Sequence, residues 1–192
     1  MRNIAGILLA AGRGARFGGH KLLHPLNDAT PLGVASARHL LAALPHSLAV
    51  VRSDDEILSA RLSAAGMRVI VCDRADQGMG VSLSTGVAAD RNAQGWVIAL
   101  ADMPFIEVET IKNVVALLQQ GAPLVAPCHQ GRRGHPVGFG RAFRDQLLAL
   151  RGDQGARDLL MRHASQLVLL PVDDEGVLAD VDTPADIGGH PN

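Results

Sequence analysis

Short apolar runs alternate with longer amphipathic segments along this chain. The apolar runs are rich in Val, Ile, Leu and Ala and predict buried strands at residues 4–9, 47–51, 67–71, 96–101 and 124–127. Between them, apolar positions recur at helical spacing and predict helices at residues 32–43, 54–65 (with Ser53 or Asp54 as N-cap), 81–91 and 107–120. The C-terminal third is less regular; we expect strands at 136–139 and 166–170, and helices near 142–150 and 156–164.

This order of elements predicts an α/β fold. Strands that are apolar on both faces are typical of a parallel sheet covered by helices, and the connections between such strands are right-handed. We therefore expect three layers, with a Rossmann-like, mostly parallel sheet and helices on both faces. In open sheets of this kind ligands bind beyond the carboxyl ends of the strands. The loops that follow the strands are the places to look for chemistry.

Composition narrows the class of protein. The 192 residues fit one domain, residues 1–192, which can bury a core without disulfides. A formal net charge of -1 argues against nucleic acid or an anionic membrane as a partner. Cys72 and Cys128 have no metal-binding spacing and are expected to be free thiols in a reducing compartment. The sequence lacks the layout of a signal peptide and an apolar run of membrane-spanning length, so we expect a cytoplasmic protein.

The loop after the first predicted strand carries the clearest chemical signal, since residues 9–21 read LAAGRGARFGGHK. Glycines let backbone N–H groups approach an anion, and the basic side chains add positive charge, so the loop is suited to a polyphosphate. The spacing fits neither the dinucleotide fingerprint nor the P-loop. Phe17 stands at the third glycine position of the first, and His20 separates Gly19 from Lys21 in the second. The alternative is a glycine turn with solvated arginines.

Carboxylates follow at two later positions. Asp102 comes directly after the apolar strand at 96–101 and before Pro104. Magnesium prefers one or two carboxylates together with phosphate and water oxygens, so Asp102 is a candidate metal ligand; its alternative role is to cap a turn. Residues 180–186 read DVDTPAD, which also fits the cap of a short helix with Pro184 at its first position.

Three further segments combine glycine with polar side chains. Residues 77–84 (QGMGVSLS) precede a predicted helix whose free N–H groups, with Ser82, could contact a nucleotide; a plain loop-to-helix turn is the alternative. Residues 131–139 (GRRGHPVGF) and 151–157 (RGDQGAR) carry arginines with His135 and Asp153. Here the alternatives are exposed arginines, a packed histidine and Asp153 as a helix N-cap.

These segments resemble, in their order along the chain, the motifs of the molybdenum cofactor cytidylyltransferase family. The matching patterns are LAAGxxxRFGGxK, GMGxSL, DxP, GHPVxF, GDxGAR and DxDTPxD. The wider group is the superfamily of nucleotidyltransferases with a glycosyltransferase-A-like fold, in which the glycine-rich loop wraps a nucleoside triphosphate. The resemblance implies that residues 1–105 mainly bind the nucleotide, and that residues 106–187 mainly bind the acceptor and complete the sheet.

The resemblance also implies a role for individual residues. Catalysis falls to Lys21, Arg16 and Asp102, and the metal ligands are Asp102 and Asp182, with Asp180 as the weaker candidate for the second position. The implied nucleotide-binding residues are Ala10, Ala11, Gly12, Arg13, Gly14, Arg16, Lys21, Gly78, Gly80 and Ser82. The implied acceptor-binding residues are Arg133, His135, Asp153 and Arg157.

The implied reaction is the Mg²⁺-dependent transfer of CMP from CTP to the terminal phosphate of molybdenum–molybdopterin cofactor, with release of pyrophosphate. Mn²⁺ is an alternative metal, and a molybdoenzyme is the implied recipient of the product. The loop begins LAAG, whereas guanylyltransferase relatives carry LAGG there, and this difference favours cytosine as the base of the nucleotide. The alternatives are GTP as donor, a sugar or alcohol phosphate as acceptor, an NAD(P)-dependent oxidoreductase, and a noncatalytic protein that delivers cofactor.

Overall fold

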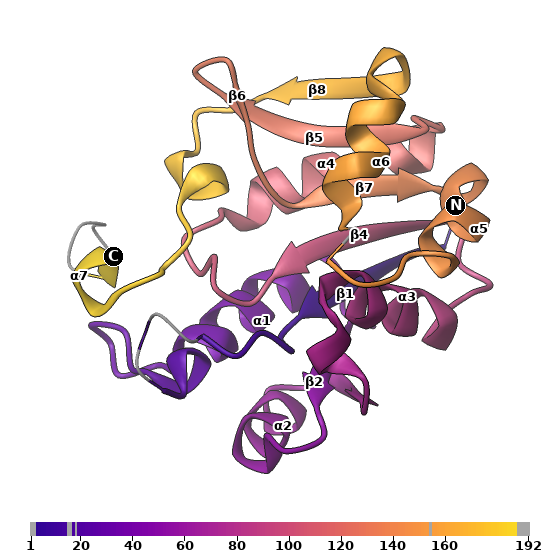
Figure 1. Ribbon diagram of the computed structural model, residues 1–192. Coiled ribbons are helices and arrows are strands. Elements are labelled where there is room, and N and C mark those ends of the chain that lie inside the picture. The colour runs from indigo at the N-terminus through magenta and orange to yellow at the C-terminus, as the bar shows by residue number, and fades with distance from the viewer. Residues whose placement is uncertain (1–2, 15–16, 18, 154, 188–192) are drawn as a thin grey trace.

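The computed structural model describes residues 3–14, 17, 19–153 and 155–187. Within these residues, helices cover both faces of one eight-stranded sheet (Figure 1). The strands are β1 (Ile4–Leu9), β2 (Leu48–Arg52), β3 (Arg68–Cys72), β4 (Gly95–Leu100), β5 (Leu124–His129), β6 (Arg132–Arg133), β7 (Val137–Gly140) and β8 (Leu167–Pro171). The α-helices are α1 (Leu32–Ala43), α2 (Glu56–Ala64), α3 (Met79–Ala89), α4 (Val108–Gln120), α5 (Arg144–Leu148), α6 (Ala156–Arg162) and α7 (Pro184–Ile187).

The sheet is mostly parallel, with one antiparallel strand in its middle. The order is β3-β2-β1-β4-β7-β5-β6, and β8 pairs with β5. β1 is parallel to β2 and β4, β2 to β3, and β5 to β8, whereas β7 is antiparallel to both β4 and β5. The predicted α/β fold is therefore confirmed. The antiparallel direction of β7 was not predicted, because it depends on pairing with β4, where Trp96 lies opposite the distant Phe139. The strand β6 pairs with the neighbouring β5 and was not predicted, because two exposed residues show no apolar pattern.

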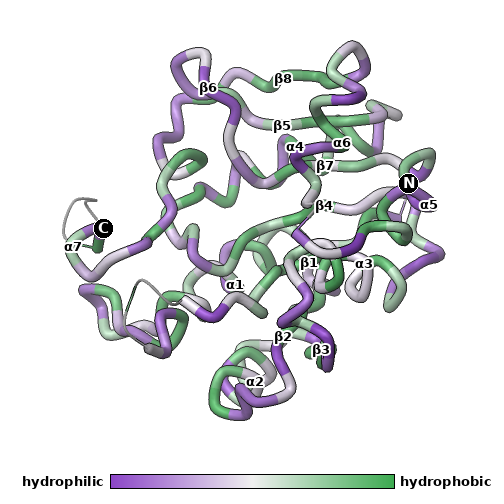
Figure 2. The backbone as a smooth tube through the Cα atoms, in the orientation of Figure 1, coloured by the Kyte–Doolittle hydropathy of each residue, from purple (hydrophilic) through white to green (hydrophobic). Residues whose placement is uncertain are grey.

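Alternate residues along the strands pack into two hydrophobic cores, one on each face of the sheet. Leu8 and Ala99 lie side by side in the β1–β4 register and pack into a cluster with buried residues of α1, α2 and α4. Their neighbours Ile7 and Ile98 face the other way, into a cluster with α3, α5 and α6. This is the pattern expected of a sheet buried on both faces. Hydrophobic residues accordingly follow the strands, while several connecting loops are hydrophilic (Figure 2).

Helix ends agree with the sequence signals in most places. Gly121 ends α4 in the left-handed conformation at φ 105°, as glycine allows. At α2 the prediction was wrong by one residue, because Asp55 is the N-cap and its side chain accepts a hydrogen bond from Leu58 N at 3.2 Å. Cys72 is buried, Cys128 is partly buried, and both are free thiols. No helix within the described residues is long and apolar enough to cross a bilayer.

The C-terminal segment returns to the carboxyl edge of the central strands. Val181 and Ile187 are buried against Leu32 at the start of α1. The backbone N–H of Val181 donates to the carbonyl of Asp102 at 2.9 Å. Figure 1 accordingly shows α7 beside the connection between β1 and α1. This packing brings the last of the candidate carboxylates to the end of β4.

Candidate active site

A pocket of about 790 Å³ lies at the carboxyl edge of β1 to β4. Its walls come from the loops that follow these four strands, together with Asp153 from the segment before α6. The nucleotide-binding candidates that line it are Ala11, Gly12, Arg13, Gly14, Gly78 and Ser82. Lys21 and Asp102 line it as well. The site thus stands where an open α/β sheet is expected to bind its ligand.

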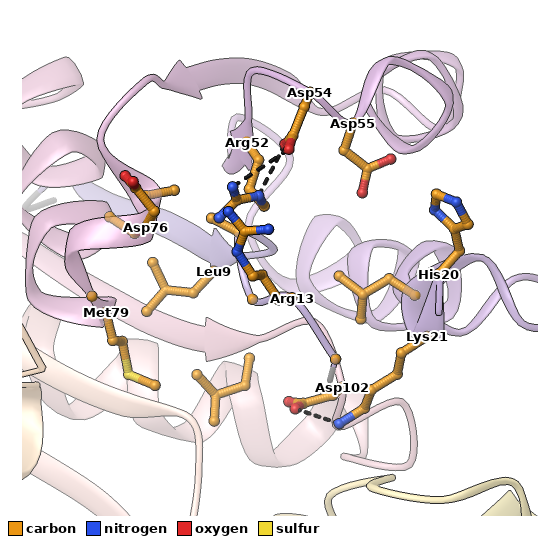
Figure 3. Close-up of a pocket in the computed structure, with 18 of the residues that line it drawn as sticks. Leu9, Arg13, His20, Lys21, Arg52, Asp54, Asp55, Asp76, Met79 and Asp102 are labelled. Carbon is orange, nitrogen blue, oxygen red and sulfur yellow. Dashed lines mark hydrogen bonds and ion pairs between the residues drawn. The ribbon is translucent and has the colours of Figure 1, made fainter. Parts of the chain in front are cut away.

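Lys21 connects the two candidate metal ligands. Its Nζ donates to Asp102 Oδ2 at 3.0 Å and to Asp182 Oδ1 at 3.1 Å, and the first of these contacts is drawn in Figure 3. The Lys21 side chain is only 8% exposed, against 31% for Asp102 and 40% for Asp182. Burial by itself would lower the pKa of Lys21, but hydrogen bonds and charge from the two carboxylates outweigh it and raise that pKa above its ordinary value. The ammonium group is therefore firmly protonated.

Two backbone contacts hold Asp102 in place. Ser36, buried on α1, donates from its Oγ to the carbonyl of Ala101 at 2.9 Å. On the other side, the carbonyl of Asp102 itself accepts from Val181 N at 2.9 Å. The residue is thus fixed between α1 and the C-terminal segment, and its carboxylate points to Lys21 Nζ (Figure 3).

The turn at residues 182–187 combines a helix cap with a carboxylate aimed at the site. Asp186 Oδ2 accepts from the backbone N–H groups of Asp182 and Thr183 at 2.9 and 2.7 Å, and from Thr183 Oγ1 at 3.0 Å. These donors, the Thr183 N–H first among them, lower the pKa of Asp186. Asp186, inside α7, therefore fixes the start of this helix by binding the two residues before it, while Asp182 turns its carboxylate to Lys21. Within the described residues no hydrogen bond or ion pair joins the exposed Asp180 to Lys21, so the geometry favours Asp182 as the partner of Asp102.

The donor set fits a divalent cation that arrives with phosphate. Two carboxylates already converge on one positive charge, and magnesium takes one or two carboxylates with phosphate and water oxygens completing its shell. Within the described residues no group of three or more His, Cys, Asp or Glu side chains could hold a metal ion. Asp102 and Asp182 are thus suited to Mg²⁺ or Mn²⁺ shared with a substrate phosphate.

The loop after β1 is built closely around Lys21. Ala10 N donates to Val50 O at 2.9 Å and so ties the start of the loop to β2. Gly14 has a φ of +58°, and a Cβ at this position would lie 2.9 Å from Lys21 Cβ. A Cβ on Gly12 would meet nothing within 4 Å, so this backbone is open to a ligand. The predicted phosphate contact Arg16 lies outside the described residues.

The segments around Gly78 and Asp153 meet in the fold. Gly80 N donates to Gly152 O at 2.8 Å, and a Cβ on Gly78, whose φ is +112°, would overlap the carbonyl of Gly152. The N-cap of α6 is Gly155, so the alternative interpretation of Asp153 as that cap is wrong. Asp153 lies in the pocket with Gly78 and the buried Ser82. Its role as an acceptor ligand stays a prediction.

The other three acceptor candidates do not line this pocket. Arg133 on β6 and Arg157 on α6 are exposed. Nδ1 of His135 is buried and has no hydrogen-bond partner among the described residues. Burial lowers the pKa of His135, and nearby Arg133 acts in the same direction against the opposing charges of Asp102 and Asp180. Burial thus favours the neutral imidazole of His135, which lies near Asp102 and Asp180, and its acceptor role stays a prediction.

Arg52 and Asp54 belong to the same pocket and were missed from the sequence. Arg52 Nε donates to Asp54 Oδ1 at 2.9 Å, and this hydrogen bond lowers the pKa of Asp54. Arg13 and Asp76 line the same pocket (Figure 3), and the charge of Arg13 also lowers the pKa of Asp54. Both missed residues could have been found from their position, because Arg52 ends β2, which is parallel to β1, and Asp54 follows two residues later, where ligands of such sheets bind.

Comparisons with known proteins agree with this geometry. Residues 6–167 match the family described as MobA-like NTP transferase domain. The chain is 33% identical to the purine catabolism protein PucB of Bacillus subtilis, over 94% of this chain and 92% of that protein. It is 30% identical to nicotine blue oxidoreductase of Paenarthrobacter nicotinovorans, again over 94% and 92%. A molybdenum cofactor guanylyltransferase of Cupriavidus metallidurans is 26% identical over 98% of this chain and 94% of its own.

Solved structures give the same result. Rv0371c of Mycobacterium tuberculosis superposes with a TM-score of 0.83 at 28% identity, and the match covers 96% of this chain and 95% of that one. Its complex with manganese has a TM-score of 0.79 at 25% identity over the same shares. The chain therefore belongs to the family of MobA-like NTP transferase domains, and it is a nucleotidyltransferase of that family.

Proposed function

We propose that this protein transfers CMP from CTP to the terminal phosphate of molybdenum–molybdopterin cofactor and releases pyrophosphate. The observation that carries the proposal is the convergence of Lys21, Asp102 and Asp182 beside the open glycine loop. A cation and two carboxylates next to the backbone N–H groups of a glycine loop suit the transfer of a phosphoryl-linked group between two polyanions.

The roles of the residues follow from charge. The attacking phosphate oxygen of the acceptor is already anionic at neutral pH, so no strong protein base is needed, and catalysis comes from positioning and charge neutralisation. Lys21 and Arg16 bind the β- and γ-phosphates and stabilise the departing pyrophosphate. The backbone of Gly12 and Gly14 donates N–H groups to the same phosphates. Asp102 and Asp182 would hold Mg²⁺, which, when bound, supplies positive charge at the reacting phosphates.

The choice of CTP and of the acceptor rests on sequence motifs and on similar proteins as well as on the pocket. The LAAG run at residues 9–12 resembles the cytidylyltransferase branch. Gly78 and Ser82 line the pocket, where a backbone group and a hydroxyl could contact a pyrimidine edge. Gly80 does not line it, and its N–H donates to Gly152, so Gly80 supports the Gly78 segment. The relative named molybdenum cofactor guanylyltransferase supports a molybdopterin-type acceptor, and the manganese complex of Rv0371c supports a divalent metal. A molybdoenzyme is the proposed recipient.

The test is pyrophosphate release with Mg²⁺ and each of the four nucleoside triphosphates, with and without isolated molybdenum cofactor. We expect release only when CTP and cofactor are both present. Release with GTP instead of CTP would keep the mechanism and refute the choice of base. Release with CTP and a sugar or alcohol phosphate, but not with cofactor, would refute the acceptor.

The similarity to nicotine blue oxidoreductase favours a second candidate, an NAD(P)-dependent oxidoreductase. The loop after β1 argues against an oxidoreductase, because Phe17 occupies the third glycine position of the dinucleotide fingerprint. Calorimetric titration with NADPH decides between them, and we expect no binding. A noncatalytic delivery protein would instead bind CTP and cofactor without releasing pyrophosphate.

A further inference from the structure

The ammonium group of Lys21 stands between the two carboxylates assigned to the metal. Its Nζ lies 3.0 Å from Asp102 Oδ2 and 3.1 Å from Asp182 Oδ1. Both are charge-assisted contacts within hydrogen-bond distance. The side chain is 8% exposed, which makes it far less accessible than either carboxylate. A divalent cation approaching these oxygens meets a positive charge already bound to both.

We propose that Lys21 closes the Asp102–Asp182 pair to divalent cations until a polyphosphate in the loop after β1 draws its ammonium group away. The proposal rests on the assignment of Asp102 and Asp182 as metal ligands in the proposed function. It adds an order of events, in which the cation binds with the nucleotide and not before it.

Electrostatics favours this order. With Lys21 in place, the three groups carry a net charge of −1, and a cation that displaced the ammonium would leave it without a carboxylate partner in a largely buried position. A polyphosphate offers the same ammonium several anionic oxygens. Lysine is a compact charge on a flexible four-carbon stem, so a small movement of Nζ suffices to change partners. The carboxylates it leaves then attract a cation.

The loop links phosphate binding to this movement. Gly14 lies against the Lys21 stem so closely that a Cβ there would be 2.9 Å from Lys21 Cβ. Gly12, in contrast, has open space where a side chain would be. A polyanion bound to the N–H groups of this loop therefore comes into the immediate neighbourhood of Lys21.

The first test measures Mn²⁺ binding to the protein without any nucleotide, by electron paramagnetic resonance. Lys21→Met should bind Mn²⁺ at least about tenfold more tightly than the wild type, a coupling of ordinary size. Lys112→Met, which removes the same charge from an exposed position on α4, should bind like the wild type. Adding Asp102→Asn to Lys21→Met should abolish the gain. Equal affinity of wild type and Lys21→Met, or a gain that survives Asp102→Asn, would overturn the proposal.

The second test uses the wild-type protein and inorganic tripolyphosphate without metal, so it depends neither on a folded variant nor on the choice of base. The Nζ resonance of Lys21 in ¹⁵N-lysine-labelled protein should shift as tripolyphosphate saturates the Gly12 amide. An unchanged Nζ resonance at saturation would overturn this inference and leave the proposed function standing. Failure of tripolyphosphate to bind at all would count against both.

Discussion

Replacing Asp102 by asparagine separates the chemical role of this residue from its structural one. The substitution keeps the size of the side chain and the backbone contact to Val181, and removes one negative charge. Asp102 is 31% exposed, and Lys21 keeps its contact with Asp182 at 3.1 Å. A partly exposed ion pair contributes at most about 1 kcal/mol, so unfolding should become easier by no more than that. For a chain of this size the expected fall in Tm is about 2–4 °C.

The effect on rate should be much larger. Asp102 would hold the divalent cation whose positive charge stabilises the reacting phosphates in the transition state, and the loss of one such stabilising group costs roughly 10²–10³ in kcat. Pyrophosphate release measures the rate, and circular dichroism during heating measures the stability. Asp145→Asn is the matched control, because Asp145 is 82% exposed on α5 and has Arg144 as its partner. Near-normal turnover of Asp102→Asn would remove Asp102 from the mechanism, and a collapse of the fold would make its role structural.

Three other perturbations test separate parts of the structure. Asp174→Ala should destabilise the fold by about 2–3 kcal/mol in urea unfolding, because the buried carboxylate accepts from Thr110 Oγ1 at 2.6 Å and from the backbone N–H before α4. Burial lowers the pKa of His135 below its ordinary 6.5, so as the pH falls the imidazole is protonated in the unfolded chain before it is protonated in the folded one. The free energy of unfolding should therefore fall as the pH drops through 6.5. His135→Gln should make the free energy of unfolding depend less on pH in this range. Gly12→Ala should leave Tm nearly unchanged but weaken tripolyphosphate binding in calorimetry, whereas Gly14→Ala, at φ +58°, should cost about 1–2 kcal/mol.

Each of these has its own control. Asp173→Ala removes an exposed carboxylate next to Asp174 and should have little effect on urea unfolding; an equal loss in both variants would contradict the capping role of Asp174. For His135, a direct titration of its imidazole by NMR with a pKa at or above 6.5 would refute the expected pH dependence. Tripolyphosphate affinity unchanged in Gly12→Ala would mean that the phosphates bind elsewhere.

Local patterns in the sequence determined most of the secondary structure. The apolar runs and helical spacings identified β1, β4 and α4 to within a residue or so, since burial on one or both faces imposes a period that neighbouring residues display. The same patterns implied a sheet with helices on both faces, and so a ligand site at the strand ends. They could not give the antiparallel direction of β7, because Trp96 pairs with Phe139 across a wide separation in sequence.

In the active site, too, some features could be predicted from the sequence and others depend on the tertiary structure. The sequence alone marked Lys21, Asp102 and Asp182 as chemical candidates, because their residue types and neighbours suit phosphate and metal binding. Only the tertiary structure brought these three side chains into contact. It did so by burying Val181 against Leu32 and by the hydrogen bond from Val181 N to the carbonyl of Asp102. It also brought Asp153 to the Gly78 segment, added Arg52 to the pocket and kept Arg157 out of it. Residue chemistry is a local property of the chain, whereas which side chains meet is decided by how distant apolar surfaces pack.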